Sequence, residues 1–195
     1  HTAILKISDY NKQKLLGTTV DDAVGECFDK VARVLGLPYP GGPEIDKLAK
    51  EGENNIKFIV SNSLHKSLNF SFSGIKTSVI NYIHNKDQKK EEYSKADVAR
   101  SFEECVTDEL CDKVIRAALL SGIKKIVIAG GVGANSMLRA KLDERCKKEG
   151  IEIYYPVLKY CTDNAAMIGS AAYYYAKDKK GFAELDLTAK PNVDL

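Results

Sequence analysis

A glycine-rich turn in the last third of the chain is the first place where the sequence could bind a ligand. Residues 130–135 read Gly-Gly-Val-Gly-Ala-Asn and stand between the apolar run 125–129 and a helical pattern. Backbone amides at the start of a helix can hold a phosphate or a nucleoside, and Asn135 could bond a sugar or a base edge there. Alternatively, the glycines allow a sharp turn from strand to helix, and Asn135 caps the helix. The turn matches neither the dinucleotide-binding fingerprint nor the P-loop, so its spacing leaves both interpretations open.

A second candidate is the turn at residues 39–43, which reads Tyr-Pro-Gly-Gly-Pro. The turn exposes backbone, and the carboxylates of Asp29, Glu44 and Asp46 flank it in the sequence. Carboxylates beside bare backbone suit the hydroxyls of a ribose. A rigid turn beside a solvated helix face would explain the same residues without a ligand.

Asp163 is a candidate for a metal ligand, although a structural explanation also exists. Thr162 suits the N-cap of a helix, and an aspartate in the first turn complements the helix dipole. The same geometry can hold a carboxylate rigidly for one coordination position of a metal. The three histidines are isolated and form neither His-Glu-x-x-His nor His-x-x-x-His. This chain alone therefore does not assemble a metal site built mainly on histidine.

Residues 74–77, Gly-Ile-Lys-Thr, superficially resemble the end of a P-loop. That motif also needs an earlier glycine, which this sequence lacks. We therefore reject a phosphate-binding loop at this position.

The first half of the chain should position these residues with a hairpin and helices. Short β-prone runs at 2–8 and 14–20 predict an antiparallel hairpin. Apolar residues keep one face from 21 to 35, which predicts a helix that Gly36 closes. Pro43 suits the first position of a second helix that runs to about residue 50.

The remainder predicts an α/β fold. Residues 68–73 alternate like a strand, and residues 75–83 could be helical. The strongest helix spans residues 95–120, where apolar side chains repeat every four residues, and it ends at Gly122. Strands at 125–129 and 151–155 then alternate with helices at about 135–148 and 163–177, which indicates parallel strands with helices on their faces.

Composition places few further limits on function. The 195 residues suffice for one large domain or two small ones. The net charge of +2 is too small to indicate binding to nucleic acid or to an acidic membrane. The five cysteines lack Cys-x-x-Cys spacing and predict reduced core thiols of a cytosolic protein. We expect no signal peptide, and no apolar run approaches the roughly 20 residues that span a bilayer. Because a strand-like run follows His1 at once, we expect a fragment of a larger protein.

Several segments together resemble the ordered motif series of the TsaD family, formerly labelled O-sialoglycoprotein endopeptidase or glycoprotease. Each segment alone is a weak indication of the family, whereas the ordered set is highly specific. The segments are residues 16–30, 39–43, 70–77, 129–135 and 161–168. The resemblance covers nearly the whole chain, from His1, which would end a Ser-Gly-Gly-His motif, to the tail at 187–191.

This resemblance implies an actin-like, sugar-kinase-like (ASKHA) α/β fold of two related halves, with a mixed sheet and flanking helices. Residues 1–195 would form a single C-terminal domain, the second half, with a helical insertion at about 37–95. The first half would be absent, and the ligand site would lie between the halves.

The resemblance also implies roles for individual residues. Asp29, Gly42 and Asp46 would contact the ribose region of the nucleotide, Gly131 and Asn135 the adenosine, and His1 the phosphate or carbamoyl side. Asp163 would be a ligand of one divalent metal, iron or zinc. The family's other principal metal ligands form a His-x-x-x-His pair in the first half.

The implied reaction transfers the threonylcarbamoyl group from threonylcarbamoyl-AMP to the adenosine next to the anticodon of a tRNA. ATP or threonylcarbamoyl-AMP would be the bound nucleotide. The implied partners are tRNA, a TsaB-like paralogue, a TsaE-like ATPase and an upstream synthase, in the cytoplasm and away from membranes. With half of the cleft missing, the fragment alone should be inactive.

Two alternatives belong to other functional classes. A nucleotide-binding module related to sugar kinases and chaperone ATPases would share the glycine turns but would not need Asp163. A metalloprotease, which the old family label suggests, would need a zinc-binding histidine pair and a glutamate base, and the sequence lacks that pattern.

Overall fold

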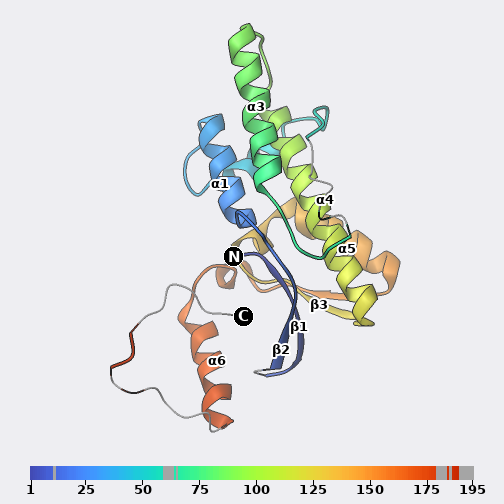
Figure 1. Cartoon of the computed structure of the whole chain (residues 1–195), viewed down its shortest axis with the longest axis vertical. Coiled ribbons are helices and arrows are strands. Elements are labelled where there is room, and N and C mark those ends of the chain that lie inside the picture. The colour runs from blue at the N-terminus through green and yellow to red at the C-terminus, as the bar shows by residue number, and fades with distance from the viewer. Residues whose placement is uncertain (11, 59–63, 65, 179–183, 185, 189–195) are drawn as a thin grey trace.

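The computed structural model describes residues 1–10, 12–58, 64, 66–178, 184 and 186–188. It begins with the expected hairpin of β1 (Ala3–Asp9) and β2 (Lys12–Thr18), which pair antiparallel. Figure 1 shows the hairpin beside the last helix, α6 (Ala165–Lys177). The Tyr10 ring at the hairpin tip stacks on Tyr174 of α6, with ring centroids 3.5 Å apart. His65 and the tail residues from 189 onward lie outside the described residues.

The main core lies among the helices α1 (Val24–Leu35), α2 (Gly41–Ala49), α3 (Ser73–Lys89), α4 (Lys95–Ser121) and α5 (Ser136–Glu149). The predicted apolar face of α1 is buried, and Gly36 closes the helix with a left-handed φ of 75°. Ser94 caps α4 by accepting a bond from the amide of Asp97. Thus α2 and α3, which fall in the predicted insertion, pack into the same core as α1 and α4. The division into a domain and an insertion stays a prediction.

The start of α2 differs from the expected one. The helix begins at Gly41, so Pro43 is its third residue and not its first. The side chain of Asp29 explains the difference, because its Oδ1 accepts a bond from the amide of Gly41 at 2.7 Å. That bond satisfies an amide that the first turn of a helix leaves free, so α2 starts earlier.

The predicted strand at residues 68–73 is also wrong. In this described segment, Phe70 makes one isolated bridge to Thr19, and α3 then begins at Ser73. Phe70 and Phe72 are both buried, which accounts for the alternating pattern. The chain turns into α3 because the carboxylate of Asp21 accepts bonds from the amides of Phe72 and Ser73, at 2.8 and 3.3 Å.

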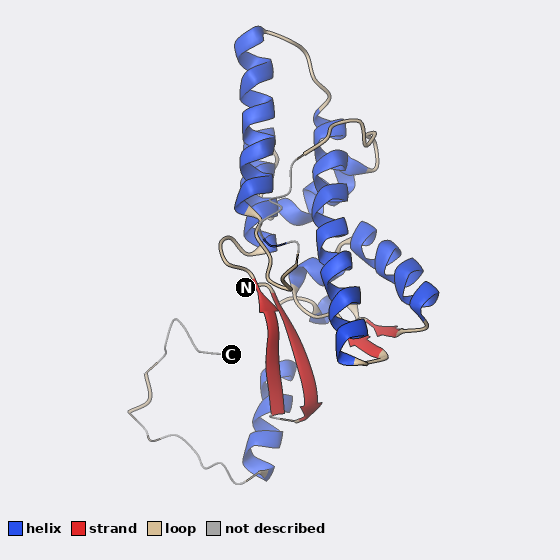
Figure 2. Cartoon of the chain, turned by 45° about the vertical axis from the view of Figure 1, so that its right-hand side comes forward, coloured by secondary structure: helices blue, strands red, loops and turns tan. Residues whose placement is uncertain are grey.

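The last third contains the expected parallel α/β unit. β3 (Lys125–Val127) and β4 (Glu152–Tyr154) pair parallel, with α5 as the crossover between them. Both strands are shorter than predicted. A single mixed sheet is not found in the described residues, because the hairpin and the β3–β4 pair form separate two-stranded sheets (Figure 2).

The described residues include all five cysteines, and each is free, as expected from their spacing. Four are buried and Cys105 is half-buried. Burial raises the pKa of the Cys27 thiol to about 12, so this side chain is a neutral core thiol. Among the described residues, no helix is long and apolar enough to cross a membrane.

Candidate functional site

A cleft of 340 Å³ lies where α1, the start of α2 and the glycine turn before α5 meet. It brings together most of the residues singled out from the sequence, which come from separate segments of the chain. Those that line it are Asp29, Gly42, Asp46, Gly131 and Asn135. Phe28, Pro40, Pro43 and Val132 supply apolar walls. Apolar walls with a few convergent polar groups are typical of a small-molecule site.

Asp29 forms one wall of the cleft and fixes the close packing of α2 on α1. A side chain at Gly41 would put its Cβ 2.5 Å from the Cβ of Ala32 and 2.8 Å from the Cα of Asp29. Only glycine therefore fits at residue 41. A Cβ at Gly42 would meet nothing within 4 Å, so Gly42 leaves open space at the mouth of the cleft.

Asp46 also lines the cleft and bonds to the start of α5. Its Oδ1 accepts bonds from the hydroxyl and the amide of Ser136, at 2.6 and 3.1 Å. Partial burial acts to raise the pKa of Asp46, but the Ser136 bonds and the nearby Lys50 outweigh it, and the pKa lies below its usual value. Asp46 is therefore an ionised acceptor at neutral pH.

Asn135 is buried at the N-terminus of α5, where it has two partners. Its Oδ1 accepts a bond from the amide of Leu138 at 2.8 Å, which confirms the capping interpretation. Its Nδ2 donates to Oε1 of Glu103 at 2.5 Å. Capping and a position on the cleft wall are thus compatible in one side chain.

Glu103 is the site residue that sequence reasoning missed. It lies on α4 and is only 1% exposed. Burial is the main cause that raises its pKa to about 7. A signal was present in the sequence, since Glu103 shares a four-residue stripe of α4 with Ala99, Thr107 and Cys111, all of which are buried.

The glycine turn folds into a short 3-10 helix, Gly131–Ala134. Gly130 enters it with a φ of 89°, a conformation that favours glycine. Arg139 holds the turn by donating from Nε to the carbonyl oxygen of Gly133 at 2.6 Å. Gly131 lies on the cleft side of this turn.

His1 lines a larger neighbouring cavity of 660 Å³, and not the cleft itself. Its Nε2 lies 2.7 Å from the hydroxyl oxygen of Thr18. The two cavities share Asp29 and Gly131 in their walls. His1 is therefore next to the cleft, on the far side of these shared residues.

Asp163 is exposed and directly follows Thr162, which lines the cleft. The N-cap of α6 is Asn164, whose Oδ1 accepts a bond from the amide of Met167 at 3.0 Å. The prediction that Thr162 caps this helix is wrong, because the helix starts later than expected. Among the described residues, no group of three or more His, Cys, Asp or Glu side chains could hold a metal.

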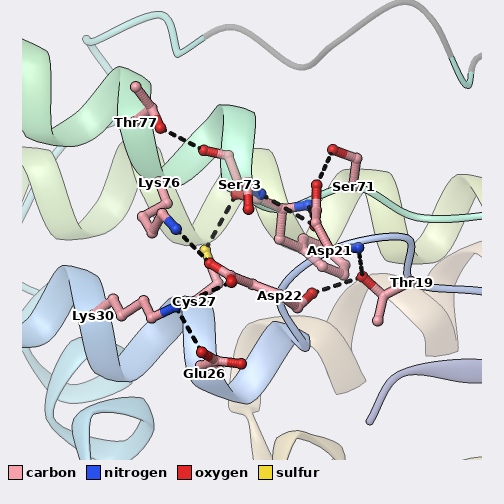
Figure 3. Close-up of polar contacts among 11 residues, drawn as sticks. Thr19, Asp21, Asp22, Glu26, Cys27, Lys30, Ser71, Ser73, Lys76 and Thr77 are labelled. Carbon is pink, nitrogen blue, oxygen red and sulfur yellow. Dashed lines mark hydrogen bonds and ion pairs between the residues drawn. The ribbon is translucent and has the colours of Figure 1, made fainter.

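A second polar cluster joins the motif at residues 16–30 to the motif at residues 70–77 (Figure 3). We call it the latch; it consists of Asp21, Asp22, Lys30, Ser71, Ser73 and Lys76. Asp21 accepts from the hydroxyl of Ser71 at 2.5 Å and holds the amides at the start of α3.

Asp22 is the charged centre of the latch. Lys76 lies 2.6 Å and Lys30 3.0 Å from its carboxylate oxygens, and Lys30 also pairs with Glu26 at 2.6 Å. The bond from Lys76 is the main cause that holds the pKa of Asp22 below its usual value. Lys76 thus serves an ion pair that joins α3 to the segment before α1.

Residues 1–170 match the family model described as TsaD, tRNA N6-adenosine threonylcarbamoyltransferase. Curated relatives with that name include a Clostridium botulinum protein, 53% identical over 197 residues, and a Clostridium perfringens protein, 50% identical over 196 residues. Each alignment covers 100% of this chain but only 57% and 58% of the relative, so the chain spans little more than half of their length.

Two solved structures share the fold at low sequence identity. The crystal structure of T. kodakarensis HypF superposes with a TM-score of 0.58 and 19% identity, over 80% of this chain and 20% of HypF. Full-length HypF in its phosphate- and nucleotide-bound form superposes with a TM-score of 0.58 and 22% identity, over 82% of this chain and 21% of HypF. These likenesses concern the fold alone, whereas the family model and the curated relatives agree on one family. By sequence, the chain belongs to the TsaD family.

Proposed function

We propose that the full-length protein transfers the threonylcarbamoyl group of threonylcarbamoyl-AMP to the tRNA adenosine next to the anticodon. In this proposal the present chain binds the nucleotide part of the donor. The observation that carries it is the meeting of Asp29, Gly42, Asp46, Gly131 and Asn135 at one cleft. The family membership supports the same activity.

The cleft suits an adenosine nucleotide in its size and its polar groups. Asp29 and Asp46 both line it and can accept bonds from ribose hydroxyls. Gly42 and Gly131 carry no side chain that would keep the nucleotide from the backbone. Asn135 presents its amide to the base, and His1 in the adjoining cavity would meet the phosphate or carbamoyl side.

The chemistry needs a nucleophile and a leaving group in one place. The exocyclic amine of the tRNA adenosine attacks the carbamoyl carbon, the bond to AMP breaks, and the amine loses a proton. By holding the AMP portion, the cleft would orient the carbamoyl carbon toward the tRNA, and such positioning lowers the barrier. ATP would occupy the same cleft through its adenosine.

Asp163 would hold the single divalent metal, iron or zinc, next to this site. One carboxylate is fewer than the roughly four ligands of a zinc site, so ligands from outside this chain must complete it. When bound, the metal would polarise the carbamoyl group as a Lewis acid. An exposed carboxylate beside Thr162 on the cleft wall fits that position.

The wider assembly follows from this assignment. The chain would be the second half of an actin-like, sugar-kinase-like protein, with a helical insertion at about 37–95. A TsaB-like paralogue and a TsaE-like ATPase would assist it, and an upstream synthase would supply the adenylate. Because the substrate is tRNA, we place the protein in the cytoplasm.

The test is transfer of labelled threonine into unmodified tRNA by the full-length protein, given threonylcarbamoyl-AMP and its partners. Asp163→Ala should abolish incorporation, about 100-fold or more, because metal polarisation of the carbamoyl group is lost. The variant should still bind adenosine, since Asp163 does not line the cleft. The 195-residue chain alone should give no transfer.

The alternative of a regulatory nucleotide-binding module predicts another pattern. Such a module would bind nucleotide and give no incorporation even in the unmutated protein. Full incorporation by Asp163→Ala would contradict the metal role but keep the transferase.

A further inference from the structure

Glu103 has its carboxyl group directly behind the cleft, in contact with a residue of its wall. It is 1% exposed, and its neighbours come from the helices that form the site. Asn135 approaches from α5 and Asp46 from α2. Nothing in the proposed function uses this buried titratable group.

The bonds around Asn135 determine how the Glu103 carboxyl is oriented. The amide of Leu138 is a donor, so it must face Oδ1 of Asn135, and Nδ2 must therefore face Glu103. Glu103 presents an acceptor oxygen, Oε1, to that Nδ2. Its proton, when present, sits on the other oxygen and is free to bond Asp46.

The charges around Glu103 favour that proton. Burial raises its pKa most, and the charge and a hydrogen bond of Asp46 raise it further, whereas Asn135 and the charge of Arg100 lower it. Asp46 stays ionised because Ser136 and Lys50 stabilise its charge. Below neutral pH, the pair thus holds one proton on Glu103 and one charge on Asp46.

We propose that Glu103 is a positioning residue of the nucleotide cleft: its neutral carboxyl fixes the Asn135 amide and bonds Asp46, and its ionisation weakens nucleotide binding. This inference rests on the proposed function, because it takes Asn135 and Asp46 as nucleotide contacts. An ionised Glu103 beside an ionised Asp46 repels it, which displaces the acceptor offered to the ribose.

The experiment measures adenosine binding to the full-length protein at about pH 5.5 and about pH 8.5, on either side of the Glu103 transition. Adenosine is the probe because the terminal phosphate of ATP titrates near neutrality. The affinity of the unmutated protein should fall by about tenfold as the pH rises. Glu103→Gln keeps an acceptor for Asn135 and a donor for Asp46, so its affinity should stay at the low-pH value throughout.

Glu104→Gln is the matched control. Glu104 is the next residue of α4 but pairs with Arg100 and Lys141 outside the cleft. This variant should keep the pH dependence of the unmutated protein. Glu103→Leu removes both bonds and should bind weakly at either pH.

Thermal unfolding gives a readout of the Glu103 proton that does not depend on binding. The carboxyl has an ordinary pKa of 4.5 and a folded-state value of about 7. Between these values the unfolded chain loses its proton while the folded chain keeps it, so stability falls as the pH rises. Glu103→Gln should therefore raise the thermal midpoint more at alkaline than at acid pH.

The outcomes separate the two proposals. Failure of the unmutated protein to bind adenosine at either pH overturns the proposed function. Binding that keeps the same pH slope in Glu103→Gln overturns the role of Glu103 and leaves the nucleotide cleft in place. Adenosine affinity that does not change with pH in the unmutated protein also overturns the role of Glu103.

Discussion

Two pairs of aspartates, Asp21 and Asp22 before α1 and Asp29 and Asp46 on α1 and α2, have similar exposure but different partners. Asp22 in the latch and Asp46 in the cleft have side chains that are 15% and 18% exposed, so burial does not distinguish them. Asp22 has a lysine on each carboxylate oxygen, at 2.6 and 3.0 Å. Asp46 is held mainly by the neutral hydroxyl and amide of Ser136, and its one lysine is 61% exposed.

This difference separates a structural carboxylate from one that can bind a ligand. Lysine neutralises the charge of Asp22 and ties two helices together. Neutral donors orient Asp46 and leave its charge in the cleft, where a ribose hydroxyl can meet it. Asp21 and Asp29, the other two aspartates, both accept a bond from the backbone at the start of a helix. Asp21 accepts from the amide of Phe72, before α3, and Asp29 accepts from the amide of Gly41 in α2.

The largest effect should come from Gly41→Ala, which should disrupt the cleft by disturbing the packing of α2 on α1. The new Cβ would overlap the backbone of Asp29 and the side chain of Ala32, so α2 must move away from α1. Overpacking of this kind costs about 1–3 kcal/mol of unfolding free energy. We expect a thermal midpoint lower by about 2–12 °C and loss of adenosine binding.

Gly42→Ala is the matched variant. Its Cβ meets no neighbour, so the thermal midpoint should hold while adenosine affinity falls, because the methyl group takes space at the mouth of the cleft. If Gly42→Ala changed the thermal midpoint and the adenosine affinity in the same way as Gly41→Ala, Gly42 would not face the ligand.

Asp22→Ala should affect stability without affecting binding. It leaves Lys76, whose side chain is 19% exposed, without its carboxylate, which costs about 1–3 kcal/mol of unfolding free energy. Thermal unfolding of the full-length protein measures the loss, and Asp22→Asn should show a smaller one because it keeps acceptor oxygen. A large fall in adenosine affinity would show that the latch and the cleft are one functional unit.

The sequence predicted the elements well where local pattern determines them. The buried stripe of α1, the four-residue spacing of α4 and the parallel β3–β4 unit all follow from periodicity, and Gly36 and Gly122 close their helices as expected. Among the residues that line the cleft, Asp29, Asp46 and Asn135 were candidates from their places beside two turns, and the family resemblance added Gly42 and Gly131.

What the sequence could not predict depends on distant partners. Residues 68–73 alternate like a strand, but Asp21, some 50 residues earlier, takes their amides and starts α3. Ser136 orients Asp46 across 90 residues of chain. The four-residue stripe on α4 indicates that Glu103 is buried, but the contact with the site arises because α2 and α5 both pack on α4, which no local pattern encodes.

The smallest effect should come from Glu26→Gln, a neighbour of the latch that pairs with its Lys30. Glu26 pairs with Lys30 at 2.6 Å, but its side chain is 52% exposed and water replaces the lost partner. Lys30 also keeps Asp22, so the thermal midpoint should change by less than about 1 °C and the adenosine affinity not at all. Thermal unfolding of Glu26→Gln beside Asp22→Ala measures both on one scale. If the two losses were equal, the strength of the latch would come from its summed charge, and the lysine partners of Asp22 would not distinguish it from Asp46.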